Sequence, residues 1–267
     1  MQRLCRSVGF LIYIYCIMCF SETQSYLNFL MLTIGSLYLI VINKNKRLSI
    51  SLFYLGLKDL IQGLSYRNLR NRESTNFLTS LSWIHICFQP LFVNLYFSHF
   101  DTQFKYWNYI FIGCFIYGAY CVTILHEFDI QQCSKCVQHI KKDNDYCADK
   151  TESYIGKFHL GYRFNTNMYE NIRFFTYALI LCIPFFTRAW ILNFCWFAFI
   201  ALISLFSYIN NVAFGEESAI WCFLSIFIGL PVALYSDNIL RWVRSVPTIF
   251  QIFQFVFYQK RVVIKNV

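Results

Sequence analysis

Charged residues are scarce in this chain. They make up 14% of its 267 residues, whereas hydrophobic residues make up 57%, and soluble domains carry roughly a quarter charged residues. So few charges leave too little polar surface to keep the chain in water, and they gather between apolar stretches instead of covering helix faces. A large soluble domain is therefore excluded. The sequence also lacks an Asn-x-Ser/Thr glycosylation site, an internal repeat and a low-complexity segment.

What the chain has instead is a series of long apolar stretches bounded by polar or charged residues. A hydrocarbon core of about 30 Å needs roughly 20 helical residues, and most of the stretches have that length. The sequence predicts an all-α fold, a polytopic transmembrane bundle of about seven spans within residues 25–235. The expected spans are 25–43, 48–66, 77–97, 107–125, 172–187, 189–208 and 218–235.

The two ends of the chain are expected to lie beside the bundle. Residues 1–24 have a basic start and a twelve-residue apolar run, so three interpretations stay open: a signal peptide, an uncleaved interfacial extension, or a start of synthesis at Met18. Residues 236–267 are expected to form an interfacial helix and a basic cytoplasmic tail. The run Pro247–Tyr258 is too short to cross and is followed by Lys260 and Arg261.

The net charge of +9 raises the question of nucleic acid as a partner. We expect none, because the basic residues lie at helix ends and tails, where they meet phospholipid headgroups. The short connections that carry Lys46, Arg47 and Arg188, together with the tail, hold ten Lys and Arg on one side against at most five on the other. This favours an outside N-terminus and an inside C-terminus. The expected partner is the lipid bilayer, and protein partners are not indicated.

Four of the twelve cysteines are expected on the outer side: Cys19, and Cys133, Cys136 and Cys147 in the long connection 126–171. Two disulfides among them are feasible in an oxidising compartment. Zinc is an alternative, since Cys133-x-x-Cys136-x-x-His139 with Cys147 offers four ligands at plausible spacing. Unrelated free thiols are the third interpretation, and all three stay open.

Ionisable and amide side chains inside the expected spans are costly in lipid, so each calls for a partner or a purpose. Asp59 and Gln62 share one face of the second span, and His85 lies at matching depth in the third. We expect an Asp59–His85 pair, with Gln89 beside it and Glu216, Glu217 and Trp221 nearby, around a polar cavity open to the outside. A small molecule or a lipid is the expected occupant. The alternative is that these groups are interhelical contacts worth only about 1 kcal/mol each.

Several short stretches resemble a family of multi-pass membrane proteins known only as a domain of unknown function. They are Met18–Ser25, Leu57–Gln62, His85–Asn94, Tyr154–Tyr162 and Glu217–Phe223. The resemblance implies a seven-span bundle and a start at Met18. It points to Asp59, Gln62, His85, Gln89, His159, Glu217 and Trp221 as site positions. The chain departs from the family where Lys58-Asp59 replaces an apolar residue followed by Glu, and where Tyr162 replaces Trp.

These observations favour a non-enzymatic membrane protein, either receptor-like or part of a complex. No cofactor is expected, and the seventh span has no lysine to form a retinal Schiff base. An intramembrane lipid hydrolase or transferase is the enzymatic alternative, although His85 is the only histidine in a span and zinc hydrolases need about three protein ligands. A carrier and a membrane subunit of a larger assembly are the remaining alternatives.

Overall fold

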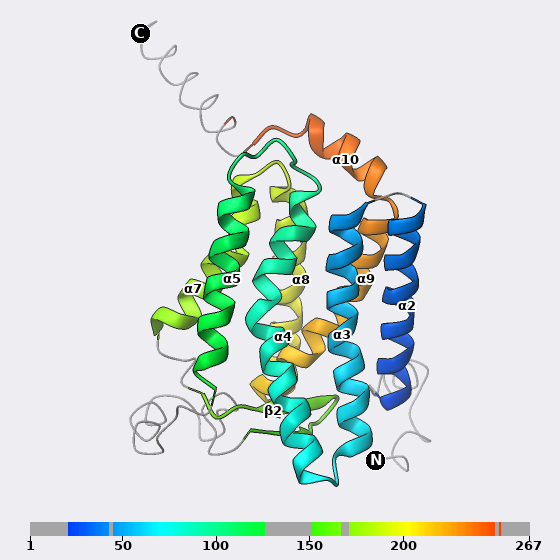
Figure 1. Cartoon of the computed structure of the whole chain (residues 1–267), viewed down its shortest axis with the longest axis vertical. Coiled ribbons are helices and arrows are strands. Elements are labelled where there is room, and N and C mark those ends of the chain that lie inside the picture. Colours follow the sequence, from blue (N-terminus) through cyan, green and yellow to red (C-terminus); the bar gives the residue numbers. More distant parts are fainter. Residues whose placement is uncertain (1–20, 43–44, 126–150, 167–170, 249–250, 252–267) are drawn as a thin grey trace, which may run out of the picture.

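The computed structural model describes residues 21–42, 45–125, 151–166, 171–248 and 251, and these are mostly helical (Figure 1). The side chains of residues 171–174, 214, 218–219, 221–225 and 227–228 are not described. The helices are α2 (Glu22–Val41), α3 (Lys46–Asn68), α4 (Arg72–Ser98), α5 (Trp107–Thr123), α7 (Asn171–Leu181), the 3-10 helix η2 (Ile183–Phe186), α8 (Trp190–Ile209), α9 (Phe214–Leu234) and α10 (Ser236–Ser245).

Side-chain caps define where the first three helices begin. The Ser21 hydroxyl accepts a hydrogen bond from the Gln24 backbone N–H, and the Asn45 and Asn71 side chains do the same for Leu48 and Ser74. Each cap satisfies one of the four backbone donors that a helix start leaves unpaired. Because the caps follow the preceding helix after only a few residues, α2, α3 and α4 are antiparallel neighbours.

The fifth expected span, 172–187, is not one continuous helix. Helix α7 has 11 residues and ends at Leu181, and the chain then turns through η2, which begins around Pro184. Proline lacks a backbone N–H and its ring clashes with the preceding helical turn, so an α-helix cannot continue through it without loss. The expected span at 172–187 is therefore divided between α7 and η2.

The helices form two layers with a cap at each end (Figure 1). Helices α2 to α5 stand side by side in chain order, while α7, α8 and α9 pack behind them. Helix α10 lies across one end. At the other end lies an antiparallel hairpin of β1 (Glu152–Ile155) and β2 (Leu160–Arg163), which packs on α9 and α4. We call these the α10 end and the hairpin end.

Two of the described helices, α2 and α8, are by themselves long and apolar enough to cross a bilayer. A clear set of seven such helices, as the sequence suggested, is not found in the described residues. Helix α5 has 17 residues and α7 has 11, whereas α3 carries Lys58, Asp59 and Gln62 in its middle. Individual hydropathy therefore supports membrane association but does not show a seven-span topology.

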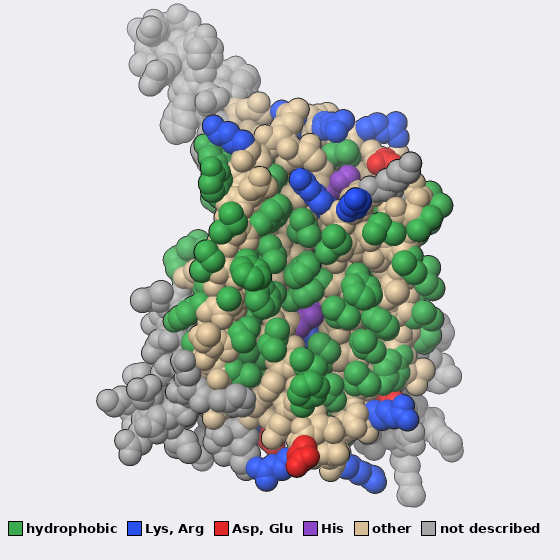
Figure 2. Space-filling view, in the orientation of Figure 1, with side chains coloured by type: hydrophobic (Ala, Val, Ile, Leu, Met, Phe, Trp, Pro, Cys, Tyr) green, Lys and Arg blue, Asp and Glu red, His purple; other side chains and the backbone are tan. Residues whose placement is uncertain are grey.

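The polarity of the surface is inverted relative to a water-soluble protein. Large apolar side chains are exposed around the middle of the bundle, such as Ile116 (63% exposed) and Leu202 (64%), whereas Asp59 and Gln62 are fully buried. Figure 2 shows apolar side chains over the middle of one face and most of its Lys and Arg toward the two ends. Exposed apolar surface of this extent marks a contact with lipid or protein.

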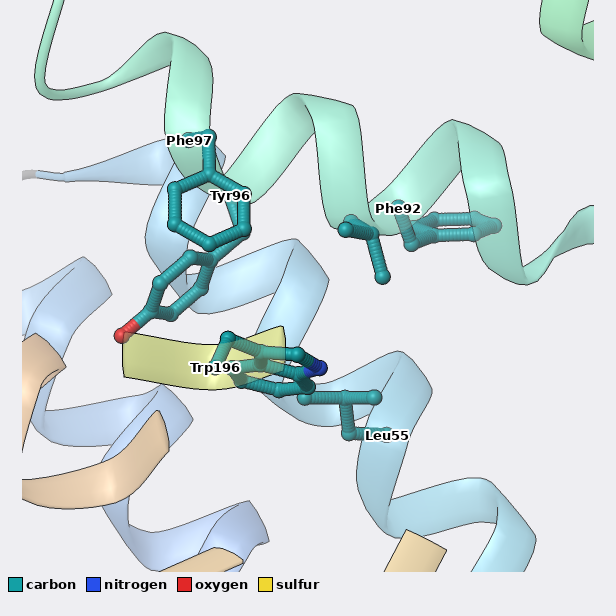
Figure 3. Close-up of a pocket in the computed structure, with 6 residues that line it drawn as sticks. Leu55, Phe92, Tyr96, Phe97 and Trp196 are labelled. Atoms are coloured by element: carbon teal, nitrogen blue, oxygen red, sulfur yellow. The ribbon is translucent and has the colours of Figure 1, made fainter. Parts of the chain in front are cut away.

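The centre of the bundle is closely packed. Leu55, Phe92, Phe97 and Trp196 surround an apolar space of about 10 Å³, large enough for a single water at most (Figure 3). The hydroxyl of Tyr96 points away from this space and donates to the Gly229 carbonyl at 2.9 Å, joining α4 to α9. This part of the interior is a structural core with no room for a ligand.

Candidate functional site

The candidate site begins with one turn of α3 near the hairpin end. Lys58, Asp59 and Gln62 are each at most 1% exposed. Successive residues on a helix point about 100° apart, whereas residues three apart share a face. Asp59 and Gln62 therefore point together toward α2, and Lys58 points elsewhere.

Glycines bring α2 and α3 unusually close along this face. A Cβ at Gly63 would lie 2.8 Å from the Tyr26 ring, and one at Gly56 would lie 3.1 Å from the Leu32 Cβ. This register places the Asn28 amide and the Lys58 charge near the Asp59 carboxyl, although no hydrogen bond joins Asn28 to Asp59.

The four side chains Ser25, Asn28, Asp59 and Gln62 form what we call the polar centre, and all are buried to within 1%. In the described part of the chain, neither oxygen of Asp59, neither amide atom of Gln62, nor the Ser25 hydroxyl has a hydrogen-bond partner. Asn28 accepts from Gln24 at 3.1 Å, but its own amide nitrogen donates to nothing described. A buried polar group without a hydrogen bond costs about 1–3 kcal/mol, so these groups are costly to the fold unless they are paired.

Lys58 faces the hairpin. Its ammonium group lies 3.9 Å from the centroid of the Tyr162 ring, close enough for a cation–π interaction. Tyr162 in turn is buried and stacks with Phe164, whose ring packs on Trp83 of α4. The hairpin thus covers the charged turn of α3 at this end of the bundle.

A single carboxylate at the start of α9 holds the hairpin turn. Glu216, 1% exposed, accepts hydrogen bonds from three consecutive backbone N–H groups: Lys157 at 2.8 Å, Phe158, and His159 at 2.6 Å. The carboxylate comes so close that a Cβ at Gly156 would lie 2.3 Å from it, so only glycine fits there. From the sequence we expected both Glu216 and Glu217 near the polar cavity but did not predict this contact with the turn. The feature that could have indicated this contact is the turn Gly156-Lys-Phe-His159, whose backbone N–H groups need an acceptor.

His159 is placed in this turn as a neutral side chain. Its Nδ1 accepts from the Leu160 backbone N–H at 2.6 Å, and the Tyr66 hydroxyl lies 3.4 Å away. Burial lowers the pKa of His159 to about 3, and the nearby Lys58 charge adds to the effect.

His85 does not form the expected pair with Asp59. Its Nε2 donates to the Tyr54 carbonyl at 2.8 Å and its ring stacks on Tyr54, while no hydrogen bond to Asp59 is present. His85 instead lines an apolar groove of about 390 Å³ between α3 and α4, with Leu57, Ile61, Phe88 and Phe115 among the other lining residues. The histidine and the carboxylate thus lie on different sides of α3.

Where α4 meets α7, Tyr177 and Asn94 supply donors to two backbone carbonyls that prolines leave without their helical partner. Pro90 deprives the Ile86 carbonyl of its helical donor, and the Tyr177 hydroxyl of α7 contacts that carbonyl at 3.3 Å and the Gln89 side chain at 3.1 Å. Pro184 likewise deprives the Ile180 carbonyl, which receives the Asn94 amide of α4 at 3.1 Å. The two helices therefore exchange donors, and Gln89 serves the α4–α7 contact.

The remaining predicted residues are dispersed. Glu217 accepts from the Ser204 hydroxyl of α8 at 2.6 Å, and the Trp221 side chain lies outside the described residues, as do Cys19, Cys133, Cys136 and Cys147. Among the predicted residues that the structure describes, Asp59 and Gln62 share the polar centre, and Glu216 and His159 meet at the hairpin turn. The described ranges contain no group of three His, Cys, Asp or Glu side chains placed to bind a metal.

Residues 26–244 match a family of unknown function (DUF5765). Because the match spans most of the chain, the protein belongs to this family. No curated protein and no solved structure matches the chain. The family assignment supplies neither an activity nor a topology, and only the site can indicate the function.

Proposed function

We propose that this protein is a multi-pass membrane protein, with α2, α3, α4, α5, the α7–η2 pair, α8 and α9 crossing the bilayer. Two features support this: the exposed apolar side chains around the middle of the bundle, which we call the apolar belt, and the buried charged turn of α3. Lipid replaces water around such a surface. Helices too polar to cross alone are stable in a bundle when their polar faces point inward, as those of α3 do. The broken α7–η2 segment is buried against α4, where its freed carbonyl is satisfied.

In this proposal the α10 end faces the cytoplasm. Lys46, Arg47, Lys105 and Arg188 cluster there with two arginines of α10, and short-loop Lys and Arg mark the inner side. The N-terminus then lies outside, as does the hairpin. The polar centre lies on the hairpin side of the bundle and so nearer the outer face.

We further propose that the protein acts as a non-enzymatic binding bundle, receptor-like or complex-forming, and that the polar centre holds a polar ligand. The single observation that carries this is the set of unsatisfied groups on Asp59 and Gln62 in a close-packed interface. A purely structural contact would satisfy its own hydrogen bonds. A contact of this purely structural kind joins the same two helices elsewhere: the Ser36 and Ser49 hydroxyls each donate to the other residue's backbone carbonyl at 2.8 Å.

The test compares the stability of variants at Asp59 and Gln62 with that of a variant in the Ser36–Ser49 contact. In adduct-free protein in a neutral detergent, we expect Asp59→Asn and Gln62→Leu to raise the melting temperature by a few degrees. Gln62→Leu removes a buried amide without partners, and Asp59→Asn replaces a buried carboxyl with a neutral amide. Each change is expected to relieve about 1–3 kcal/mol, and about 1 kcal/mol shifts melting by roughly 2–4 °C. The matched control Ser49→Ala removes a satisfied contact and should lower it.

Native mass spectrometry completes this test. A molecule bound at the polar centre would add mass to the wild type that Asp59→Asn lacks and Ser49→Ala retains. If Asp59→Asn lowers the melting temperature of the adduct-free protein as much as Ser49→Ala does, Asp59 is an ordinary structural contact and the binding proposal is wrong.

A further inference from the structure

The described charges are distributed unequally between the two ends of the bundle. At the hairpin end five basic residues (Arg67, Arg70, Arg72, Lys157, Arg163) are matched by five acidic ones (Glu22, Glu73, Glu152, Glu216, Glu217). At the α10 end six basic residues (Lys46, Arg47, Lys105, Arg188, Arg241, Arg244) face only Asp101 and Asp237. The Asp101 carboxylate is buried and accepts from the Arg188 backbone N–H at 2.9 Å, which leaves an excess of exposed positive charge.

Two of these arginines come from distant parts of the sequence and converge on one place. Arg47, at the start of α3, reaches the Ser98 carbonyl and hydroxyl at 3.4 Å beside His99. Burial lowers the pKa of His99; the Asp237 carboxylate opposes this shift, and the nearby charges of Arg47 and of Arg244 in α10 add to it. His99 itself is fixed by the Asn45 amide, whose nitrogen lies 3.0 Å from its Nδ1. Two guanidinium groups near one point suit a phosphate, which binds arginine through paired hydrogen bonds.

Helix α10 has the shape of an element that lies in a membrane interface. Val243 is buried in the core of the bundle, with Ile239 and Leu240 packed against it. Arg241 and Arg244 are exposed, and Trp242 and Tyr235 are 47% and 65% exposed. Exposed Trp and Tyr beside Lys and Arg are typical of the headgroup level of a bilayer.

We propose that the α10 end binds anionic phospholipids, with Arg47 and Arg244 holding a headgroup phosphate and Trp242 lying at the base of the headgroups. This inference rests on the proposed membrane function. A lipid is favoured over an acidic polypeptide because the basic residues adjoin exposed aromatic side chains and the apolar belt of the bundle. A juxtamembrane base contributes about 1 kcal/mol near an anionic surface.

The experiment uses the full chain in nanodiscs of phosphatidylcholine with and without phosphatidylglycerol, at low salt, and counts bound lipids by native mass spectrometry. We expect the wild type to retain phosphatidylglycerol selectively. The pair Arg47→Gln with Arg244→Gln should weaken that retention about thirtyfold, since each arginine is worth roughly fivefold. Arg67→Gln with Arg70→Gln removes the same charge at the hairpin end and should leave retention unchanged.

Three results would overturn the inference: equal retention of the neutral and anionic lipids, equal loss in both pairs of variants, or displacement of phosphatidylglycerol by an acidic peptide at matched charge. Failure of the membrane proposal itself would appear separately, because the chain would not co-elute with nanodiscs of either composition. High salt should reduce the selectivity, since charges at this surface are screened.

Discussion

At the scale of single residues, Glu216 has the clearest role. Its buried carboxylate accepts hydrogen bonds from three backbone N–H groups of the hairpin turn. Hydrogen bonds to a charged acceptor are stronger than neutral ones, so one side chain of α9 fixes the hairpin over Lys58.

Glu216→Gln should release the hairpin turn. The amide has only one acceptor oxygen and puts a donor beside the Lys157 N–H, at an expected cost of about 2 kcal/mol. Since Lys157 is exposed, tryptic cleavage after it should become about thirtyfold faster. Glu217→Gln is the matched control, because Glu217 bonds Ser204 and not the hairpin. Equal cleavage of the two variants would contradict this role.

His159 should make the stability of the protein depend on pH. With its pKa lowered to about 3 in the folded protein and near 6.5 when unfolded, only the unfolded chain takes up a proton between those values. The free energy of unfolding therefore keeps its full value above about pH 6.5. Below that pH it falls by up to about 1.4 kcal/mol per pH unit.

His159→Asn should flatten this acid slope, because the Asn oxygen can still accept from Leu160 and does not titrate. The measurement is the melting temperature in detergent at neutral and mildly acidic pH. Tyr66→Phe removes the neighbouring hydroxyl without a titrating group, so it should keep the slope. An unchanged slope in His159→Asn would show that other groups cause it.

At the scale of elements, α4 and α7 compensate for two prolines: Pro90 within the continuous α4, and Pro184 in η2 just after α7. Each helix supplies the donor that the other helix's proline removed, through Asn94 and Tyr177. Buried carbonyls without donors are costly, so these two hydrogen bonds stabilise the α4–α7 contact.

Asn94→Leu should lower the melting temperature, because the Ile180 carbonyl loses its donor at a cost of about 1–3 kcal/mol. Adding Pro184→Ala should restore much of the loss by returning a backbone N–H to that turn. Tyr177→Phe and Pro90→Ala form the equivalent pair for the Ile86 carbonyl. If Pro184→Ala destabilises the wild type and Asn94→Leu protein equally, the reciprocal repair is not what Asn94 does.

The positions of the helices could be predicted from apolar length, because burial in lipid or protein requires it. The end of α7 just before Pro184 could not be predicted from the sequence, since a proline inside a membrane helix is often tolerated. The hairpin was missed because strands of four residues with an apolar-rich pattern differ little from loop. Asp59 and Gln62 were found together through helical spacing, whereas the separation of His85 from Asp59 depends on side-chain direction, which depth alone does not give.

At the scale of the whole molecule, the inversion of polarity connects all of these features. Leu202 in α8 is exposed, Asp59 is buried, and exposed bases gather at the α10 end. In water such an arrangement would leave a broad apolar surface that promotes aggregation. In a bilayer the same surface is solvated by lipid, and the buried polar centre is what needs an explanation.

The most direct measurement tests whether lipid or water surrounds α8. In open native membrane vesicles, a polar maleimide should leave Leu202→Cys unmodified until detergent denaturation, with the site read by peptide mass spectrometry. Lys157→Cys, exposed in the hairpin turn, should be modified at once in the same vesicles. Labelling of Leu202→Cys as fast as Lys157→Cys would mean that water, not lipid, covers the bundle, and the account would be wrong.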